Sequence, residues 1–290
     1  MSYSYVTLTR ELASVGIEEA AHEAALLLHH FAGVSRVSLL SDRNRVYDVA
    51  SLEEAVRRRL GREPLQYILG SWEFFGLPFT VNPHCLVPRA DTECLVEEAI
   101  GRLPAGGRFA DLCTGSGCIA VATLAGRPDL SAVALELYPD TLALAVKNAE
   151  ANGVGERFTP LQADLLAGGV EALRRYAPFD AILSNPPYIP THVIEGLSPE
   201  VRQEPHAALD GGEDGLVFYR AILREYTSLV RPGGMMLLEI GFDQGEALRR
   251  LCAEYLPLAS VDVLQDLGGQ DRVVCITLPK DPHTEGEGSL

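Results

Sequence analysis

The sequence predicts an α/β fold in which a mostly parallel sheet, covered by helices on both faces, follows a small helical domain. Two observations predict the sheet. From about residue 107, short apolar segments alternate with helical segments of about 10 to 15 residues, and a glycine-rich turn joins the first of these strands to a helix. Apolar residues at helical spacing in the first 62 positions predict the helical domain.

Composition limits the classes of function. The 290 residues are 47% hydrophobic and 22% charged, which suits one large and one small globular domain. The net charge of −16 argues against a protein that binds nucleic acid directly through phosphates. The six cysteines form no CxxC pair, so we expect free thiols and no metal site. With neither a membrane span nor a secretion signal in the sequence, we expect a cytoplasmic protein.

The helical domain is expected over residues 1–70. Residues 18–31 carry an apolar stripe at helical spacing. Ser51 and Glu54 fit a capping box that would start a helix there, and Gly61 supplies its stop signal.

A linking β-hairpin is expected over residues 71–84. The segment 72–81 is aromatic and β-prone, with Gly76 at a turn position. We expect Trp72 and Phe74 to pack between the two domains.

The second domain is expected over residues 85–280. Its predicted strands are residues 108–112, 132–136, 158–163, 179–184, 235–240, 258–264 and 272–278. Its predicted helices are residues 118–125, 139–152 and 215–230. Ligands of such sheets bind at the carboxyl ends of the strands. The polar tail, 281–290, is expected to be disordered.

A glycine loop follows the first strand of this domain. Gly115 and Gly117 permit positive φ and a close approach of ligand to backbone. Glu136 ends the next strand, where its carboxylate can accept hydrogen bonds from both hydroxyls of a ribose. Because residues 115–120 also fit the dinucleotide fingerprint, the glycines alone leave NAD and S-adenosylmethionine both open.

Two carboxylates favour S-adenosylmethionine. Asp111, four positions before the first glycine, would attract an ammonium or sulfonium cation and repel a pyrophosphate. Asp164, at the end of the third strand, could accept a hydrogen bond from an adenine amino group.

The strongest motif is Asn185-Pro186-Pro187-Tyr188, which directly follows a buried strand. The two prolines have fixed φ and no N–H, so they form a rigid loop that presents hydrogen-bond acceptors only. A planar –NH2 group fits this surface, with its hydrogens on the Asn185 side-chain oxygen and the Pro186 carbonyl. Tyr188 adds a flat face. Such a site can hold an amide nitrogen for methylation, and most of the rate would come from positioning.

Together these motifs resemble the HemK-type protein-(glutamine-N5) methyltransferases, most closely the branch that acts on peptide chain release factors. The resemblance covers nearly the whole chain. It is carried by residues 64–70 (PLQYILG), 87–93 (VPRADTE), 111–117, 185–188, 204–209 (EPHAAL), 211–215 (GGEDG) and 271–274 (DRVV). It implies a class I S-adenosylmethionine-dependent methyltransferase fold, Rossmann-like, with a mostly parallel seven-stranded sheet.

The resemblance also implies the site and the partner. The S-adenosylmethionine site would be formed by Asp111, Cys113, Thr114, Gly115, Ser116, Gly117, Glu136, Asp164, Leu165 and Asn185. The glutamine would be held by Asn185, Pro186, Pro187 and Tyr188, of which Asn185, Pro186 and Tyr188 are the catalytic set. The substrate implied is the glutamine of a Gly-Gly-Gln loop in a release factor, docked with help from the helical domain. We expect a monomer.

Two positions depart from the release-factor branch. Cys113 stands where that branch usually has glycine, and Cys-Thr-Gly-Ser-Gly is also common in the ribosomal-protein branch. Ala90 stands where proline is usual. Glutamine methylation of a ribosomal protein therefore stays open, as do adenine N6 methylation of DNA, which the acidic charge disfavours, and an NAD-binding oxidoreductase or non-catalytic nucleotide-binding module.

Four further features have modest predicted roles. Gly268-Gly269-Gln270 spells the substrate motif, but a tight turn before the last strand explains it better than automethylation. Glu204 and His206 are expected to order the loop after the acceptor motif. Arg89 could shape the cofactor site, and a surface or helix-cap role is equally compatible with its position.

Overall fold

The contacts of the chain divide it into two compact units. The computed structural model describes residues 2–281, so most of the tail predicted to be disordered lies outside the described residues. The first unit runs to Ser71 and also includes Leu197–Glu204, and the second contains the rest. From the sequence, Leu197–Glu204 was expected in the second domain, over residues 85–280.

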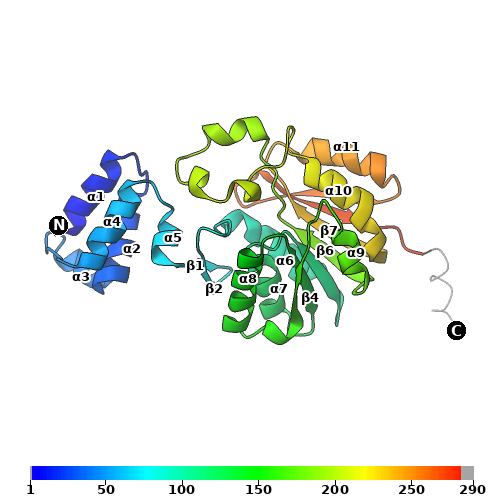
Figure 1. Cartoon of the computed structure of the whole chain (residues 1–290), viewed down its shortest axis with the longest axis horizontal. Coiled ribbons are helices and arrows are strands. Elements are labelled where there is room, and N and C mark those ends of the chain that lie inside the picture. The colour runs from blue at the N-terminus through cyan, green and yellow to red at the C-terminus, as the bar shows by residue number, and fades with distance from the viewer. Residues whose placement is uncertain (1, 282–290) are drawn as a thin grey trace. The chain divides into compact units, whose positions relative to one another are not determined.

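The first unit is helical, as the sequence predicts (Figure 1). Its helices are α1 (Tyr5–Ser14), α2 (Ala20–Ala32), α3 (Arg36–Ser41), α4 (Ala50–Leu60) and α5 (Leu65–Leu69). The predicted capping box is wrong, because α4 already begins at Ala50 and its cap residue, Val49, makes no side-chain hydrogen bond. A capping box occurs instead at α1, where the Ser4 hydroxyl accepts from the Thr7 N–H at 3.2 Å.

An ion-pair network joins Leu197–Glu204 to the helices of this unit. Arg59, which is only 3% exposed, pairs with Glu23 at 2.6 Å and with Glu200 at 2.9 Å. Arg62 also reaches Glu200, at 2.7 Å. A buried guanidinium needs such partners, because removing one of them leaves a charge without compensation. This long-range need explains why the segment belongs to the first unit.

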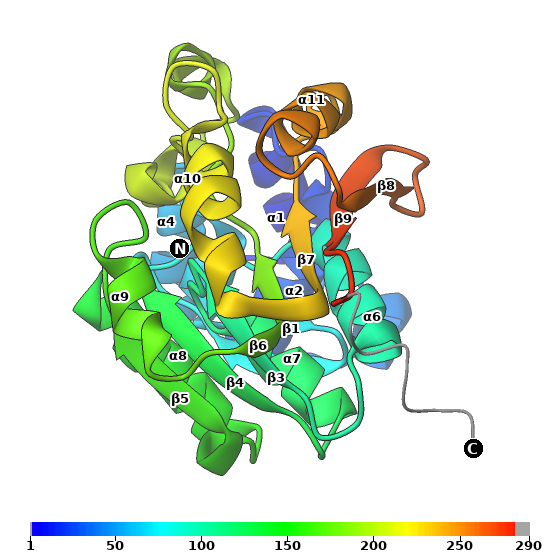
Figure 2. The ribbon, with the colours of Figure 1, turned by 90° about the vertical axis from the view of Figure 1, so that its right-hand side faces the viewer.

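The second unit is built on a seven-stranded sheet. The strands are β3 (Arg108–Leu112), β4 (Ser131–Glu136), β5 (Phe158–Gln162), β6 (Phe179–Ser184), β7 (Val230–Glu239), β8 (Ser260–Gln265) and β9 (Asp271–Thr277). Their order is β5-β4-β3-β6-β7-β9-β8, with β9 antiparallel to both of its neighbours and all other pairs parallel. Figure 2 shows β5 at one edge and β8 at the other. The predicted Rossmann-like class is confirmed.

Helices cover both faces of this sheet. They are α6 (Glu93–Arg102), α7 (Cys118–Gly126), α8 (Pro139–Ala151), α9 (Gly169–Arg174), α10 (Val217–Glu225) and α11 (Gly245–Tyr255). One apolar core lies between the sheet and α6, α7 and α8, and a second lies between the sheet and α9, α10 and α11. None of the helices between residues 2 and 281 is long and apolar enough to cross a membrane.

The predicted hairpin is present as β1 (Ser71–Phe74) and β2 (Leu77–Thr80). Its two turn residues, Phe75 and Gly76, have φ of 52° and 69°, as a tight hairpin turn requires. Phe74 was expected between the domains, and that expectation is wrong. It is 1% exposed and packs in the core of the second unit, 5.9 Å from the ring of Phe79.

Candidate active site

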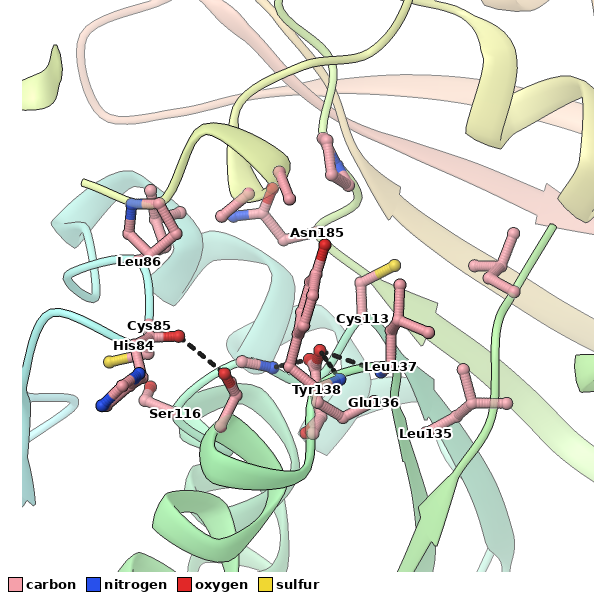
Figure 3. A pocket seen from close by; sticks show the side chains of 18 of the residues that line it. His84, Cys85, Leu86, Cys113, Ser116, Leu135, Glu136, Leu137, Tyr138 and Asn185 are labelled. Carbon is pink, nitrogen blue, oxygen red and sulfur yellow. Dashed lines mark hydrogen bonds between the residues drawn. The ribbon is translucent and has the colours of Figure 1, made fainter. Parts of the chain in front are cut away.

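A cavity of about 390 Å³ opens at the carboxyl ends of β3, β4 and β6 in the second unit (Figure 3). This volume is within the usual range for small-molecule sites. Nine of the predicted site residues line it: Cys113, Thr114, Gly115, Ser116, Glu136, Asp164, Leu165, Asn185 and Pro187. Four others, Asp111, Gly117, Pro186 and Tyr188, are not among the residues that line it. Figure 3 shows Asn185 toward one end, Glu136 toward the other, and Cys113 between them.

The glycine loop turns sharply from β3 into α7. Cys113, Gly115 and Gly117 all have positive φ, at 58°, 56° and 82°. Gly117 also packs closely on α8, since an added Cβ would lie 3.1 Å from the Ala145 Cβ. The φ of Cys113 lies in the left-handed region, which glycine adopts without strain and other residues adopt at a cost. Here the backbone holds the conformation with a side chain present on the cavity wall.

Glu136 is fixed by three backbone donors. Its Oε2 accepts from the Gly115 N–H at 3.0 Å, and its Oε1 accepts from the N–H groups of Leu137 and Tyr138 at 2.9 and 3.1 Å. Burial raises the pKa of Glu136, and these hydrogen bonds oppose that rise. The result is a carboxylate of fixed orientation on the cavity wall, which is suited to accept hydrogen bonds from the hydroxyls of a ribose.

Asp111 does not reach the wall. It is fully buried, and one carboxylate oxygen accepts from the Thr114 hydroxyl at 2.6 Å. Burial raises the pKa of Asp111 to about 7, and the bond from Thr114 opposes this rise. From the sequence, Asp111 was expected to attract a cationic ligand directly. The geometry instead places Thr114 between Asp111 and the cavity.

Asn148 on α8 is not among the site residues predicted from the sequence. Its side chain accepts from the Thr80 N–H at 2.8 Å and donates to the Thr80 carbonyl at 3.0 Å and to the Ser116 carbonyl at 2.9 Å. It is 1% exposed. It therefore ties the glycine loop to the hairpin strand β2. A lone asparagine in a helix gives no local sign of such a role.

We expect Asn148→Ala to lower the free energy of unfolding by about 2–4 kcal/mol, because it leaves one buried and two partly buried backbone groups without their side-chain partner. The measurement is urea unfolding followed by circular dichroism. Asn152→Ala is the control, since Asn152 lies one turn further along and bonds to Pro78 at an exposed position. Equal losses for the two variants would contradict the role given to Asn148.

The acceptor motif begins where β6 ends. Ser184, the last residue of the strand, donates to the Leu112 carbonyl at 2.7 Å, which fixes β6 to the end of β3. Asn185 follows and donates through Nδ2 to the Thr92 hydroxyl at 3.3 Å. Pro186 and Pro187 are buried, and Tyr188 is partly buried. The carbonyl of Tyr188 accepts from Gln244 Nε2 at 2.9 Å.

The loop after the motif packs back onto it. The N–H of Ile189 donates to Leu209, and the N–H of Gly211 donates to Ile189, at 3.0 and 2.9 Å. His206 lines the cavity, and its Nδ1 lies 3.9 Å from the carboxylate of Asp210. Glu204, expected to order the same loop, is buried and belongs to the first unit. Arg89 also lines the cavity.

The Gly268-Gly269-Gln270 segment forms a tight turn between β8 and β9. The Asp266 carboxylate accepts from the N–H groups of Gly268 and Gln270 at 2.9 and 3.0 Å, and Gly269 has φ of 76°. This turn accounts for both glycines.

Residues 2–281 contain no cluster of three or more His, Cys, Asp or Glu side chains that could hold a metal ion.

Comparison with known proteins follows the same two-part division. Residues 6–70 match the model of the PrmC N-terminal domain, and residues 90–212 match that of the methyltransferase small domain. A release factor glutamine methyltransferase of Geobacter sulfurreducens is 43% identical over 267 residues, 91% of each chain. One of Cereibacter sphaeroides is 44% identical over 272 residues, 92% of this chain and 95% of the other.

The chain belongs to the release factor glutamine methyltransferase family. The family match confirms the resemblance read from the sequence, and the protein is a methyltransferase. Among solved structures, a putative methyltransferase crystallised with SAH has a TM-score of 0.52 with 13% identity, over 70% of this chain and 54% of that chain. At that identity the likeness shows a shared fold only.

Proposed function

We propose that this protein transfers the methyl group of S-adenosylmethionine to the side-chain nitrogen, N5, of the glutamine in the Gly-Gly-Gln motif of peptide chain release factors. The observation that carries the proposal is the single cavity on whose wall the glycine loop, Glu136 and Asn185 meet. Two relatives named release factor glutamine methyltransferase match this chain over about nine tenths of both chains. Because release factors act in the cytoplasm, we place the reaction there. We also propose that the enzyme is a monomer.

The residues on the wall suit a nucleoside that carries a cation. Leu137, Tyr138 and Leu166 line the cavity and are 41%, 48% and 45% exposed, so they offer apolar surface to a flat base. Glu136 would accept from the ribose hydroxyls and Asp164 from the adenine amino group. Asp111 would act through Thr114. When bound, S-adenosylmethionine supplies an electrophilic methyl group on a sulfonium.

The acceptor side must improve a poor nucleophile. An amide nitrogen shares its lone pair with the carbonyl, so hydrogen bonds from its –NH2 group to Asn185 Oδ1 and the Pro186 carbonyl would shift density to nitrogen and fix its direction. The nitrogen so held would take the methyl group of the sulfonium, with the S–C bond breaking as the N–C bond forms and a neutral thioether as the leaving group. The nitrogen then releases one proton to solvent.

The test is transfer of labelled methyl from S-adenosylmethionine to purified release factor. We expect one methyl group per factor, located on the Gly-Gly-Gln glutamine by mass spectrometry, and none on a Gln→Ala factor. Ribosomal proteins are assayed in parallel. If a ribosomal protein is labelled and the native release factor is not, the proposed substrate is wrong and the ribosomal protein takes its place.

We expect Glu136→Gln to weaken the binding of S-adenosylmethionine by about 10- to 100-fold, as for loss of hydrogen bonds to a charged group. The glutamine side chain has an –NH2 group in place of one oxygen. This donor would face at least one of the backbone N–H groups that now donate to the Glu136 carboxylate. Titration calorimetry measures the change. Glu156→Gln, in the short turn before β5, is the control. Unchanged affinity in Glu136→Gln would contradict the proposed ribose contact.

A further inference from the structure

A buried carboxylate lies beside the acceptor motif and has no part in the mechanism described so far. Glu239 ends β7, and Ser184, the last residue of β6, is paired with Leu238. Asn185, which directly follows β6, and Glu239 are therefore the next residues along two neighbouring parallel chains. Glu239 is 1% exposed. Its backbone carbonyl accepts from the buried Tyr219 hydroxyl at 2.6 Å, which fixes the end of the strand.

Three side chains form a closed polar group at this point. The side chains of Thr92 and Asn185 both lie against the Glu239 carboxylate and lower its pKa by hydrogen bonding. Asn185 Nδ2 donates to the Thr92 hydroxyl at 3.3 Å. Thr92 is 2% exposed, and Oε2 of Glu239 has no hydrogen-bond partner within residues 2–281.

The pattern of hydrogen-bond donors and acceptors allows only one orientation of the Asn185 amide. An ionised carboxylate only accepts, so Asn185 must present its –NH2 end to Glu239, and Thr92 must donate its own hydrogen there. The second hydrogen of Nδ2 goes to the Thr92 hydroxyl. With both hydrogens committed, Oδ1 is the end of the Asn185 amide left to accept from another group.

We propose that Glu239, together with Thr92, is a positioning residue that fixes the Asn185 amide so that its Oδ1 accepts from the –NH2 group of the acceptor. The inference rests on the proposed function for the identity of that acceptor. A reversed Asn185 amide would present a donor to a donor and would not hold the acceptor nitrogen. The carboxylate acts on the orientation of Asn185 and takes no part in bond making.

Protonation of Glu239 removes this control, because a carboxylic acid can also donate to Oδ1 and stabilise the reversed amide. Burial raises the pKa of Glu239 to about 7, and the hydrogen bond from Thr92 and the charge of Arg272 oppose that rise. The ionised form is the active one, so turnover should rise with pH through about 7. The other titratable groups that interact electrostatically with Glu239 are Asp91, Cys94, Cys118, Tyr188 and Tyr219.

The first experiment compares Thr92→Val, Thr92→Ser and Glu239→Gln in the full-length protein, with saturating S-adenosylmethionine and release factor as substrate. We expect kcat to fall about 10-fold in Thr92→Val, as for one hydrogen bond in a network, while the KM for S-adenosylmethionine stays within about twofold. Thr92→Ser should recover most of the rate. In Glu239→Gln the rise of kcat with pH should disappear.

Thr123→Val is the matched control. Thr123 is also a fully buried threonine, but its hydroxyl has no hydrogen-bond partner within residues 2–281, so the variant should keep the wild-type rate. Saturation with S-adenosylmethionine separates Glu239 from Asp111, whose pKa is also about 7 and whose place in the glycine loop would affect cofactor affinity. Wild-type kcat and pH profile in both Thr92→Val and Glu239→Gln would overturn the proposal.

A second experiment needs no methyl transfer. The side-chain amide resonances of Asn185, assigned by their loss in Asn185→Asp, should shift with a midpoint near pH 7 in the wild type and stay constant in Glu239→Gln. If the wild type methylates no release factor, the proposed function fails, and these resonances still decide whether Glu239 controls Asn185. A pH-independent signal in the wild type would count against the inference.

Discussion

Asn185→Ala should lower the rate of methyl transfer by about 100- to 1,000-fold, which is the usual cost of losing one preorganised hydrogen-bonding group at a reacting centre. The variant removes the side-chain oxygen that would accept from the amide nitrogen. The Pro186 carbonyl and the rest of the loop remain, because Ser184 still fixes the end of β6 to Leu112. Single-turnover transfer to release factor measures the loss.

Cofactor binding separates this role from a general defect. Glu136, Asp164 and the glycine loop are untouched in Asn185→Ala, so the Kd for S-adenosylmethionine should stay within about fivefold, the worth of roughly one neutral hydrogen bond. Calorimetry measures it on the same preparation. Asn185→Asp is a sharper variant, since it places a second carboxylate against buried Glu239 and should be inactive near neutral pH. Near-normal turnover in Asn185→Ala would contradict the role given to this residue.

The sequence was sufficient where structure is specified locally. Residues 108–112 and 179–184 were predicted to the residue, because each is a short apolar segment that ends in polar or turn-forming residues, as buried parallel strands do. The glycine loop and the acceptor motif directly follow these strands. Once the strands are adjacent and parallel, their loops must meet at the same edge of the sheet.

The sequence was insufficient where a partner lies far along the chain. Thr92 and Asn185 are 93 positions apart, and Asn148 and Thr80 are 68 apart. No periodicity or motif pairs such residues. Thr92, Thr80 and Asn148 are ordinary polar side chains in their own segments, and only Asn185 belongs to a motif that the sequence makes visible. Only the fold shows that Thr92 restricts the amide on which the mechanism depends.

The capping-box error has a different cause. Ser51 and Glu54 have the right spacing, but the buried face of α4 includes Leu52, Ala55 and Val56. The helix begins at Ala50, one residue before Ser51, so Ser51 lies inside it and forgoes a local capping preference of about 1 kcal/mol. Most of the stability of such a helix comes from packing of its apolar face.

The second large effect is expected from Gly215→Ala, which changes no predicted site residue. A Cβ at position 215 would lie 2.3 Å from the Tyr188 carbonyl oxygen and 2.8 Å from Gln244 Nε2, at a φ of +74°. Backbone occupies the space, so Tyr188 must move or its bond from Gln244 must break. We expect a loss of about 3–5 kcal/mol in the free energy of unfolding, the sum of backbone strain and overpacking.

Gly153→Ala is the matched control. Gly153 has nearly the same φ, +71°, but an added Cβ there meets nothing within 4 Å. It should therefore cost only the left-handed strain of about 1–2 kcal/mol and leave methyl transfer unchanged. In Gly215→Ala, by contrast, transfer should fall by at least about 100-fold with cofactor affinity retained, because the shift is confined to the loop that positions the acceptor. Thermal unfolding, calorimetry and single-turnover transfer on both variants test this. Parallel behaviour of the two would mean that the acceptor loop tolerates displacement at Tyr188, and that Asn185 alone carries the positioning.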